Sequence, residues 1–285
     1  VNGAPATFVL SSGGTVQVNG NVTNNIQLST AVGTTGTIAT TSSSDTLTAT
    51  NSGGASDSIL HITGPGTVVL GSGAYAGTWD LDAGAVQVTD PTSLSGVGVN
   101  IAAGATLDAS PLGATTYTLS AALGASGSGT GSTAATLKAD ASGIIDLATG
   151  ANPINLTFTP SSATGDTAHP ALYVSQGTLS LGGNAFTIDN ESGAPLGVGT
   201  YTLISQASGN VTDGGGYAVN VTGAGLAAGT AGSIQVSGGS VSLNVISYTA
   251  QNLVWQGGNN GNTWDAGSTV NWLDGASASV FNNSD

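Results

Sequence analysis

The sequence contains no cysteine, and its 285 residues include a single basic side chain, Lys138. Without cysteine the chain has no disulfides, no thiol chemistry and no cysteine-ligated zinc site. Charged residues make up 6% of the chain, against roughly 25% in ordinary soluble domains, and the net charge is −14. So acidic a chain lacks the cationic surface that nucleic acid requires, and an anionic membrane surface would repel it. Nucleic acid and membrane surfaces are therefore excluded as partners.

Long apolar runs are also missing. No stretch of 18 apolar residues occurs, so we expect no direct membrane insertion of this segment. The chain begins VNGAPATFVL, with neither methionine nor a basic leader region. We therefore expect that any secretory signal peptide has already been removed.

Glycine, small polar residues and aliphatics are abundant instead. The 46 glycines favour tight turns, and a hydrophobic content of 39% is too high for a disordered chain. Helical periodicity is missing, because no long apolar stripe carries charges on its opposite side. The composition predicts an all-β protein.

A repeated phrase organises the chain between residues 62 and 109. A glycine turn is followed by a short aliphatic strand at 66–70, 84–88 and 104–107, and the phrase recurs at 14–18 and 177–181. The first three copies follow one another at nearly equal intervals, with a period near 20. Such a period with one strand per repeat is typical of a β-solenoid, in which successive strands stack about 4.8 Å apart in parallel sheets. This period predicts on the order of a dozen coils. A β-sandwich is the alternative, but 14 aromatic residues are few for a sandwich core.

On this interpretation the chain divides into four segments. Residues 1–61 form N-terminal coils, 62–109 the clearest repeats, and 110–250 further coils, with loops predicted near 124–133 and 160–171. Residues 251–285, rich in tryptophan, asparagine and glycine, form either a cap or the start of a further block.

The segment 62–109 resembles the autotransporter-associated β-strand repeat, which occurs in the passenger domains of bacterial type V secreted proteins and related large surface proteins. The matching positions are glycine, aliphatic and aromatic: Gly64, Gly66, Leu70, Tyr75, Gly77, Gly84, Val86, Val88, Leu94, Gly96, Gly104 and Leu107. The sequence GTYTLI at 199–204 is similar to a unit that often closes such arrays, and WQGG…WD…NW in 255–272 is similar to a segment that commonly follows them.

The resemblance implies a right-handed parallel β-helix displayed outside the bacterial cell. It implies a structural or adhesive role in surface attachment, biofilm or matrix formation, with no family-wide catalytic residue and no cofactor. The implied partners are host or matrix surfaces, including polysaccharide. A terminal coil left uncapped would also expose unpaired backbone, at which further copies of the chain would add end to end into filaments. The C-terminal membrane barrel that translocates such passengers is not among these residues, so we expect either a processed passenger fragment or part of a larger chain.

Three of the four tryptophans lie close together in sequence, at positions 255, 264 and 272. One interpretation is a cap, in which Trp255 and Trp272 cover the apolar core of the last coil. Another is a sugar-binding platform formed by Trp255, Trp264 and Trp272. Their spacing does not decide whether the indoles share a face.

Only weak candidates exist for chemistry. Asp80 and Asp82 flank Leu81, so an inward Leu81 would place both carboxylates on the outer face, about 7 Å apart, close to the separation of an inverting glycosidase pair. This favours, as an alternative, a polysaccharide-active β-helix enzyme, although a solvated pair of acids is the simpler interpretation. Calcium is a second candidate, at Asp80 with Asp82 or at 189–191. His61 and His169 have no motif partner in the sequence.

The shortage of basic residues also predicts the response to acid. With almost no salt bridges to lose, we expect acid to discharge the surface without breaking the core. The protein should then stay folded but become less soluble near pH 3 to 4.

Overall fold

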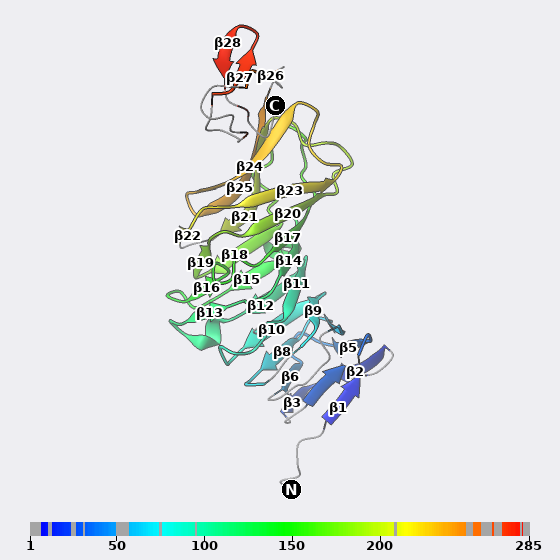
Figure 1. Ribbon diagram of the computed structural model, residues 1–285. Coiled ribbons are helices and arrows are strands. Elements are labelled where there is room, and N and C mark those ends of the chain that lie inside the picture. The colour runs from blue at the N-terminus through cyan, green and yellow to red at the C-terminus, as the bar shows by residue number, and fades with distance from the viewer. Residues whose placement is uncertain are drawn as a thin grey trace.

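The computed structural model describes residues 7–10, 13–23, 27–30, 32–49, 57–73, 76–94, 96–207, 210–248, 253–257, 264, 270–279 and 281. Nearly all of their regular structure is β-strand (Figure 1). The helical elements among these residues are two single 3-10 turns, η1 (Ser110–Leu112) and η2 (Gly131–Thr133). The prediction of an all-β chain with parallel sheets is confirmed. Tyr75, the aromatic position of the repeat, lies outside the described residues.

Two long sheets run side by side through most of the chain. The ten-stranded sheet has the order β24 (Thr230–Ser237), β25 (Ser240–Ser247), β21 (Gly199–Gln206), β18 (Leu172–Gln176), β15 (Thr136–Lys138), β12 (Ala105–Asp108), β10 (Gly84–Val88), β8 (Thr67–Leu70), β6 (Thr46–Ala49) and β3 (Asn21–Thr23). The nine-stranded sheet has the order β2 (Gly14–Val18), β5 (Thr35–Thr40), β7 (Ile59–Thr63), β9 (Thr78–Leu81), β11 (Gly98–Ala102), β14 (Leu123–Ser126), β17 (Ile154–Phe158), β20 (Ala185–Asn190) and β23 (Ala218–Gly223).

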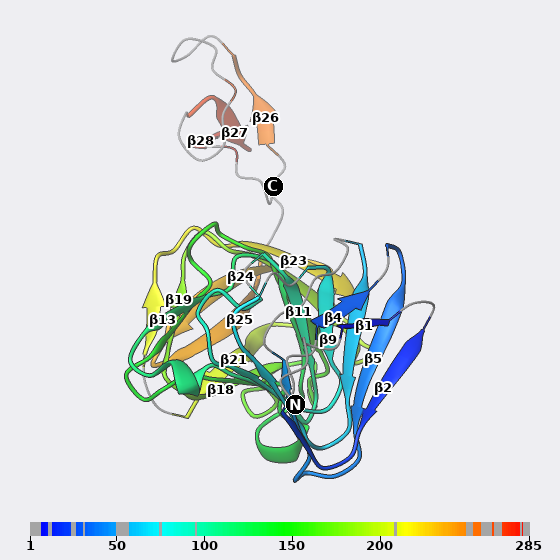
Figure 2. The same cartoon turned by 90° about the horizontal axis from the view of Figure 1, so that it is seen from below.

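Three smaller sheets complete the described structure. The four-stranded sheet has the order β13 (Thr116–Thr118), β16 (Ile144–Asp146), β19 (Thr178–Leu181) and β22 (Val211–Asp213). The two-stranded sheet pairs β1 (Thr7–Leu10) with β4 (Gln27–Thr30). The three-stranded sheet contains β26 (Leu253–Trp255), β27 (Trp272–Asp274) and β28 (Ser277–Ser279), and it stands apart from the long sheets (Figures 1 and 2).

The chain moves between the sheets in a fixed order. From β5 to β12 successive strands alternate between the nine-stranded and ten-stranded sheets, and from β13 to β23 they visit the four-, nine- and ten-stranded sheets in turn. One circuit is one passage of the chain through each of these sheets in turn. Each strand therefore lies beside the strand that the chain formed in the same sheet one circuit earlier, as the colours in Figure 1 show. Within the nine-stranded sheet every pairing is parallel.

Pairing is in register with the aliphatic side chains. Val86 pairs with Val68 on one side and with Leu107 on the other, and all three are buried. Burial alternates along both β8 and β10: Val68, Leu70, Val86 and Val88 are buried, whereas Thr67, Val69 and Gln87 lie on the outer face. Because a slip of one residue would turn every aliphatic side chain to solvent, this pattern fixes the register.

The length of one circuit changes along the chain, and the predicted uniform period of 20 is wrong beyond residue 116. Leu60 pairs with Trp79 and Trp79 with Val99, so the predicted period holds in this part. Leu123, by contrast, pairs with Ile154 and Ile154 with Phe186, so one circuit is about half as long again. The extra length forms the strands of the four-stranded sheet and the turns around them. The predicted number of coils is therefore too high.

The repeated phrase does not always occupy the same sheet. The copies at 66–70, 84–88 and 104–107 form β8, β10 and β12, which are neighbours in the ten-stranded sheet. The copies at 14–18 and 177–181 correspond to β2 of the nine-stranded sheet and β19 of the four-stranded sheet. The phrase thus encodes a glycine turn followed by a strand, wherever in the circuit that strand falls.

Two segment predictions need correction. The loop predicted near 124–133 begins with a strand, because β14 extends to Ser126 and pairs with β11 and β17. The boundary predicted after residue 61 falls inside β7. Residues 160–171, the other predicted loop, contain no strand except an isolated bridge between Asp166 and Tyr201.

A single apolar core fills the space between the sheets. Side chains from the nine-, ten- and four-stranded sheets belong to one buried cluster, whose members run in sequence from Leu10 to Val245. Seen in Figure 2, the three sheets lie on different sides of this interior. The core is closed at its C-terminal end by a change of strand direction: β21 pairs in parallel with β18 and antiparallel with β25. The sequence GTYTLI, which suggested the end of an array, lies in β21.

Candidate functional site

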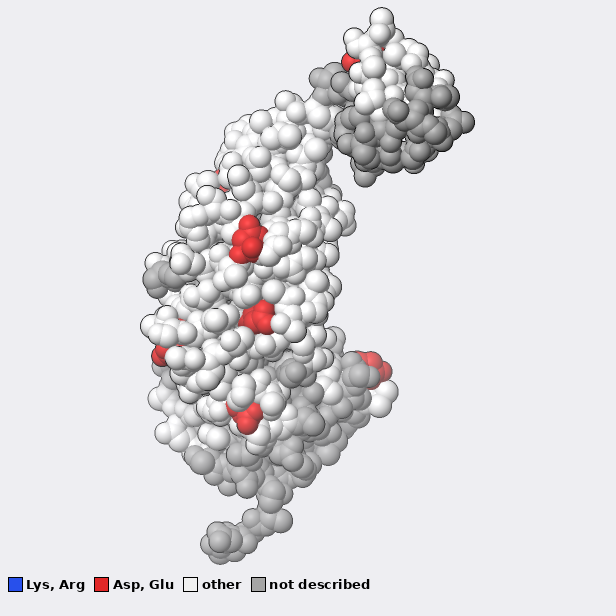
Figure 3. All heavy atoms as spheres, turned by 60° about the vertical axis from the view of Figure 1, so that its left-hand side comes forward, with Lys and Arg blue, Asp and Glu red and all other residues white. Residues whose placement is uncertain are grey.

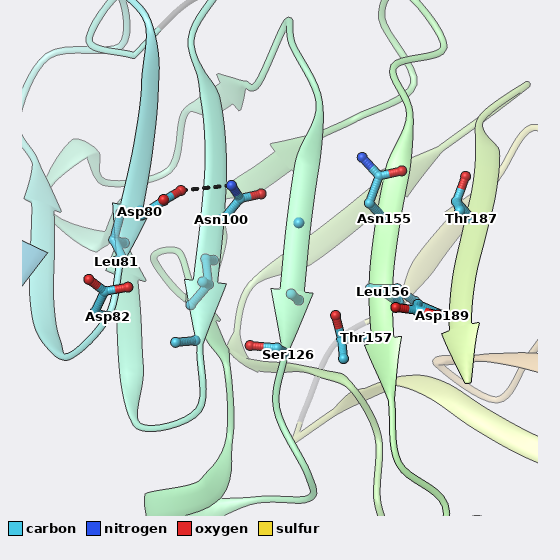
Figure 4. A pocket seen from close by; sticks show the side chains of 14 residues that line it. Asp80, Leu81, Asp82, Asn100, Ser126, Asn155, Leu156, Thr157, Thr187 and Asp189 are labelled. Atoms are coloured by element: carbon cyan, nitrogen blue, oxygen red, sulfur yellow. Dashed lines mark hydrogen bonds between the residues drawn. The ribbon is translucent and has the colours of Figure 1, made fainter. Parts of the chain in front are cut away.

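Asp80 and Asp82 lie on the outer face of the nine-stranded sheet, as the sequence predicted. Leu81 between them is fully buried, Asp80 is half-buried and Asp82 is exposed. Because successive side chains of a strand point to opposite faces, the burial of Leu81 places both carboxylates outside. They form one end of a groove that crosses five strands, β9, β11, β14, β17 and β20 (Figure 4).

One wall of the groove is a row of side chains at matching positions of these strands. Asp80 pairs with Asn100, Asn100 with Gly124, Gly124 with Asn155, and Asn155 with Thr187. The side-chain amide of Asn100 donates a hydrogen bond to Asp80 Oδ1 at 2.7 Å. Polar side chains therefore continue from strand to strand, with a gap where Gly124 has no side chain.

The second wall lies two residues further along each strand. It includes Asp82, Ser126, Thr157 and Asp189, which Figure 4 shows below the first row. Between the walls the floor is made by the backbone of the intervening residues, whose side chains are buried: Leu81, Ile101, Ala125 and Leu156. The groove has a volume of about 360 Å³.

His61 lies close to the carboxylates of Asp80 and Asp82 at the N-terminal end of the groove. Its Nδ1 lies 2.9 Å from Asp82 Oδ2 and 3.8 Å from Asp80 Oδ2. His61 pairs with Asp80 across neighbouring strands, so stacking brings together residues from successive circuits. The sequence shows no motif partner for His61 or His169, yet the fold places each beside a carboxylate, and His169 Nδ1 lies 2.9 Å from Asp166 Oδ2.

These contacts define what the acids can do chemically. Asp80 accepts a hydrogen bond from Asn100, and Asp82 interacts with the imidazole of His61. Both carboxylates are oriented by neighbours and still face the groove, where their remaining lone pairs can accept hydrogen bonds from a ligand.

The three residues of the second candidate calcium site, 189–191, do not point their side chains toward a common point. Asp189 faces outward and accepts a hydrogen bond from Thr222, whereas Asn190 is buried and its side chain bonds Ser192 and Ala194. Glu191 is exposed in the turn that follows. Within the described residues, no group of three or more histidine, cysteine or acidic side chains is placed to hold a metal ion.

The three C-terminal tryptophans form one cluster at the three-stranded sheet, with Trp255 in β26, Trp272 in β27 and Trp264 outside its strands. The ring centres of Trp255, Trp264 and Trp272 are 4.7 to 5.3 Å apart, and Phe281 lies 5.2 Å from Trp272. Trp272 is 7% exposed and Trp264 is 66% exposed. None of the three belongs to the core cluster of the long sheets. The element that pairs with β21 at the end of the stack is the β24–β25 hairpin, so the position predicted for a tryptophan lid is occupied by this hairpin.

Several acidic side chains serve the turns rather than a site. A side-chain oxygen at or just after the end of a strand accepts the backbone N–H two residues further on, at Asp90, Asp108, Asp140, Asp146, Asn190 and Asp213, and Asp166 does the same within the 160–171 segment. Such turns satisfy backbone donors that would otherwise lack partners where the chain leaves the sheet. The sequence signal was an aspartate or asparagine directly after an aliphatic strand.

Asp45 accepts hydrogen bonds from four donors. Its carboxylate accepts hydrogen bonds from the Thr41 hydroxyl and from the backbone N–H groups of Gly20, Thr41 and Ser42. The Thr41 hydroxyl contributes most, and together these donors lower the pKa of Asp45 to about 2. The side chain thereby links the turn after β5 to the turn before β3, one circuit earlier.

Asp166 plays the same role in the 160–171 segment. Burial alone would raise the pKa of Asp166, but hydrogen bonds from Ala168, Ser161 and His169 outweigh burial and hold it well below its usual range. The pKa values of Asp108 and Asp146 are also lowered, for the same balance of causes. Acid therefore removes hydrogen bonds within the folded state, which the prediction from the shortage of salt bridges did not take into account.

The remaining surface is almost free of charge. Figure 3 shows isolated carboxylates separated by broad uncharged surface on the face in view. Lys138, the only basic residue besides the histidines, is used within the ten-stranded sheet, where its Nζ lies 3.2 Å from Asp108 Oδ2. Within the described residues, no helix has the length and apolar character needed to cross a membrane.

The sequence matches no known protein family, no curated protein and no solved structure. Inference about function therefore rests on the residues and on their arrangement.

Proposed function

We propose that the chain is a right-handed parallel β-solenoid of the autotransporter-associated repeat type, acting as a structural and adhesive scaffold on the bacterial surface. The observation that carries this proposal is the in-register parallel stacking of nine strands over one continuous core. Right-handedness follows from the general preference of parallel crossover connections for that hand.

The stacked architecture suits a scaffold because a short sequence forms a long, extended molecule. Nine strands at about 4.8 Å spacing give a stack roughly 38 Å long. The outer surface offers trypsin one site, after Lys138, which lies in strand β15 and is bonded to Asp108. A protein outside the cell gains from both properties, since it must span a distance and survive proteases.

The adhesive role is tested by displaying residues 1–285 on a non-adherent bacterium and measuring its attachment to matrix-coated surfaces. The matched control is Leu107→Asp, which places a charge in the core between β10 and β15 and prevents stacking. We expect attachment with the folded chain and its loss with the control. Equal attachment of both strains, at equal surface amounts, would contradict an adhesive role of the folded stack.

Self-association is part of the same proposal. Strand β23 is the last strand of the nine-stranded sheet and presents an edge at the C-terminal end of the stack, whereas the ten-stranded sheet ends in the β24–β25 hairpin. Such edges pair readily with other chains. Electron microscopy and light scattering of concentrated protein should show end-to-end assemblies, and dispersed monomers at all concentrations would exclude them.

A second candidate, cleavage of polysaccharide, is favoured by the position of Asp80 and Asp82 in one groove. The contacts of both carboxylates with His61 and Asn100 favour binding over catalysis. Incubation with polysaccharides and measurement of new reducing ends tests this candidate, and release that disappears in Asp80→Asn and Asp82→Asn would establish it.

A further inference from the structure

The groove on the nine-stranded sheet has a hollow at its centre that arises from one residue. At Gly124 the space of a β-carbon is taken by the side chain of Asn100, which leans over from β11 while its amide nitrogen donates to Asp80. Beyond Gly124 the row resumes with Asn155, and the space between the two asparagines opens toward solvent (Figure 4). Because Gly124 has no side chain, Asn100 occupies part of this gap in the polar row, and the remaining space on the side of Asn155 is the hollow.

The side chains on the C-terminal half of the groove are free to bind. Among the described residues, Asn155, Ser126, Thr157 and Thr187 make no side-chain hydrogen bond within the chain, although all four line the groove. They supply one amide and three hydroxyls, which both donate and accept hydrogen bonds and carry no charge.

Charges at the two ends of the groove select against acidic ligands. Asp80 and Asp82 stand at one end and Asp189 at the other, while His61 is already engaged with the first pair. The single lysine lies on the ten-stranded sheet and pairs with Asp108. An anionic ligand would meet carboxylates without a compensating cation, whereas hydroxyl groups would find acceptors along the whole groove.

The dimensions favour a chain over a compact molecule. The groove spans five strands, so its length is four strand spacings, roughly 19 Å. Its volume of about 360 Å³ lies near the lower end of the range of ligand sites, about 300 to 1,000 Å³. A long and shallow site of this kind suits a linear ligand that lies along the stack.

We propose that this groove binds a neutral, hydroxyl-rich polysaccharide chain laid along the axis of the stack. Asn155 hydrogen-bonds the sugar next to the hollow, and Ser126, Thr157 and Thr187 bond the units on either side. The proposal rests on the proposed adhesive function, because it names the chemistry of the surface to which the scaffold attaches.

The test is native gel electrophoresis of the purified protein in gels containing dextran, laminarin, mannan or, as the acidic comparison, polygalacturonate. Two variants alter the groove: Asn155→Ala removes the amide, and Gly124→Asn fills the hollow. In Gly124→Asn the added β-carbon meets the flexible end of Asn100 rather than backbone, so the fold is retained. Thr106→Asn, on the outer face of the ten-stranded sheet, is the matched control. Circular dichroism verifies the fold of each variant.

We expect at least one neutral polysaccharide to retard the protein, polygalacturonate to leave it unaffected, and both groove variants to bind at least ten-fold more weakly than Thr106→Asn. The proposal is overturned if no neutral polysaccharide retards the protein, or if Gly124→Asn binds as well as the control. Loss of binding in Trp264→Ala with full binding in Gly124→Asn would assign recognition to the tryptophan cluster instead. Attachment of displaying cells that survives Gly124→Asn would overturn the groove's part in adhesion and leave the scaffold function standing.

Discussion

The stack has two parts, which enclose one continuous core with different numbers of strands in each circuit. Between β5 and β12 each circuit has two strands, and Leu60, Trp79 and Val99 mark its successive turns. From β13 onward each circuit has three strands and is about half as long again, as Leu123, Ile154 and Phe186 mark. The two long sheets nevertheless continue without interruption from one part to the other. The strand spacing is therefore common to both parts, and only the width of the interior differs.

The wider circuit is filled by larger side chains. The buried aromatics Tyr117, Phe158, Phe186 and Tyr201 all lie beyond residue 116, and Trp79 is the one described in the two-strand part. Phe158 and Tyr201 pack edge to face, with ring centres 6.2 Å apart. Because protein interiors are packed without voids, a third sheet requires more side-chain volume, and aromatic rings supply it.

The largest effect is expected where the narrow circuit brings backbones into contact. Gly84 has a φ of +71°, and a β-carbon there would collide with the carbonyl oxygens of Gly66 and Gly64. We expect Gly84→Ala to destabilise the protein by more than about 4 kcal/mol, measured by urea unfolding. Gly113, with a φ of +68° and open space around it, is the matched control, and Gly113→Ala should cost only about 1 to 2 kcal/mol. Equal costs would show that the contact with the carbonyl oxygens of Gly64 and Gly66 does not set the cost at Gly84.

The wide circuit should be most sensitive to the loss of its rings. Phe158→Ala leaves a cavity beside Tyr201 and is expected to cost about 3 to 5 kcal/mol. Phe158→Leu retains much of the apolar volume and should cost clearly less. If Val86→Ala in the narrow circuit proved as costly as Phe158→Ala in the same urea titration, the proposed link between ring volume and circuit width would fail.

Acid should weaken both parts through their turns. A carboxyl whose pKa is lowered by folding stabilises the protein above its unfolded pKa of about 3.9, and this contribution disappears as the pH falls through the folded value. For Asp45, whose folded pKa is about 2, the loss extends from about pH 4 down to about pH 2. The urea midpoint should therefore fall steeply over this range.

Asp45→Asn tests the narrow part and Asp166→Asn the wide part. Each should lower the midpoint at pH 7 and flatten its decline between pH 4 and pH 2, because the group that protonates has been removed. Glu191→Gln, at an exposed side chain, is the control and should leave both unchanged. Parallel declines in all three variants and the parent would assign acid sensitivity to other groups.

The smallest loss of stability is expected next to β22, the last strand of the four-stranded sheet. Burial and the neighbouring carboxylate of Asp213 raise the pKa of Tyr217 to about 12, and its hydroxyl donates to Asp213 at 2.6 Å. Since the unfolded phenol ionises near pH 10, this residue stabilises the fold up to about pH 10 and less above it. Tyr217→Phe should cost about 0.5 to 1.5 kcal/mol at pH 7 and should remove the phenol that titrates near pH 12 from the ultraviolet absorbance.

Much of the narrow part could be predicted from the sequence. Glycine turns followed by aliphatic alternation located β8, β10 and β12, and the same alternation placed Asp80 and Asp82 on the outer face. These features depend on neighbouring residues, which a sequence displays directly.

The wide part and the groove depend on contacts between circuits. The strands of the third sheet, such as β13 and β16, are three residues long, too short for a periodic pattern. The contact of His61 with Asp82 and the row from Asn100 to Asn155 arise only when strands stack in the observed register. Once the circuit lengthens at β13, a fixed period no longer identifies which residues become neighbours.

The register described for Leu60, Trp79 and Val99 also bears on how such a gene can change. If residues 79–98 were excised, Val99 would follow Thr78 and come to lie beside Leu60, aliphatic on aliphatic, with Asn100 beside His61. Insertion of a duplicate of the same stretch would preserve the alignment equally well. Molecular length in this part is thus quantised, about 4.8 Å for each twenty or so codons, and recombination that respects this unit can alter it without disturbing the interior.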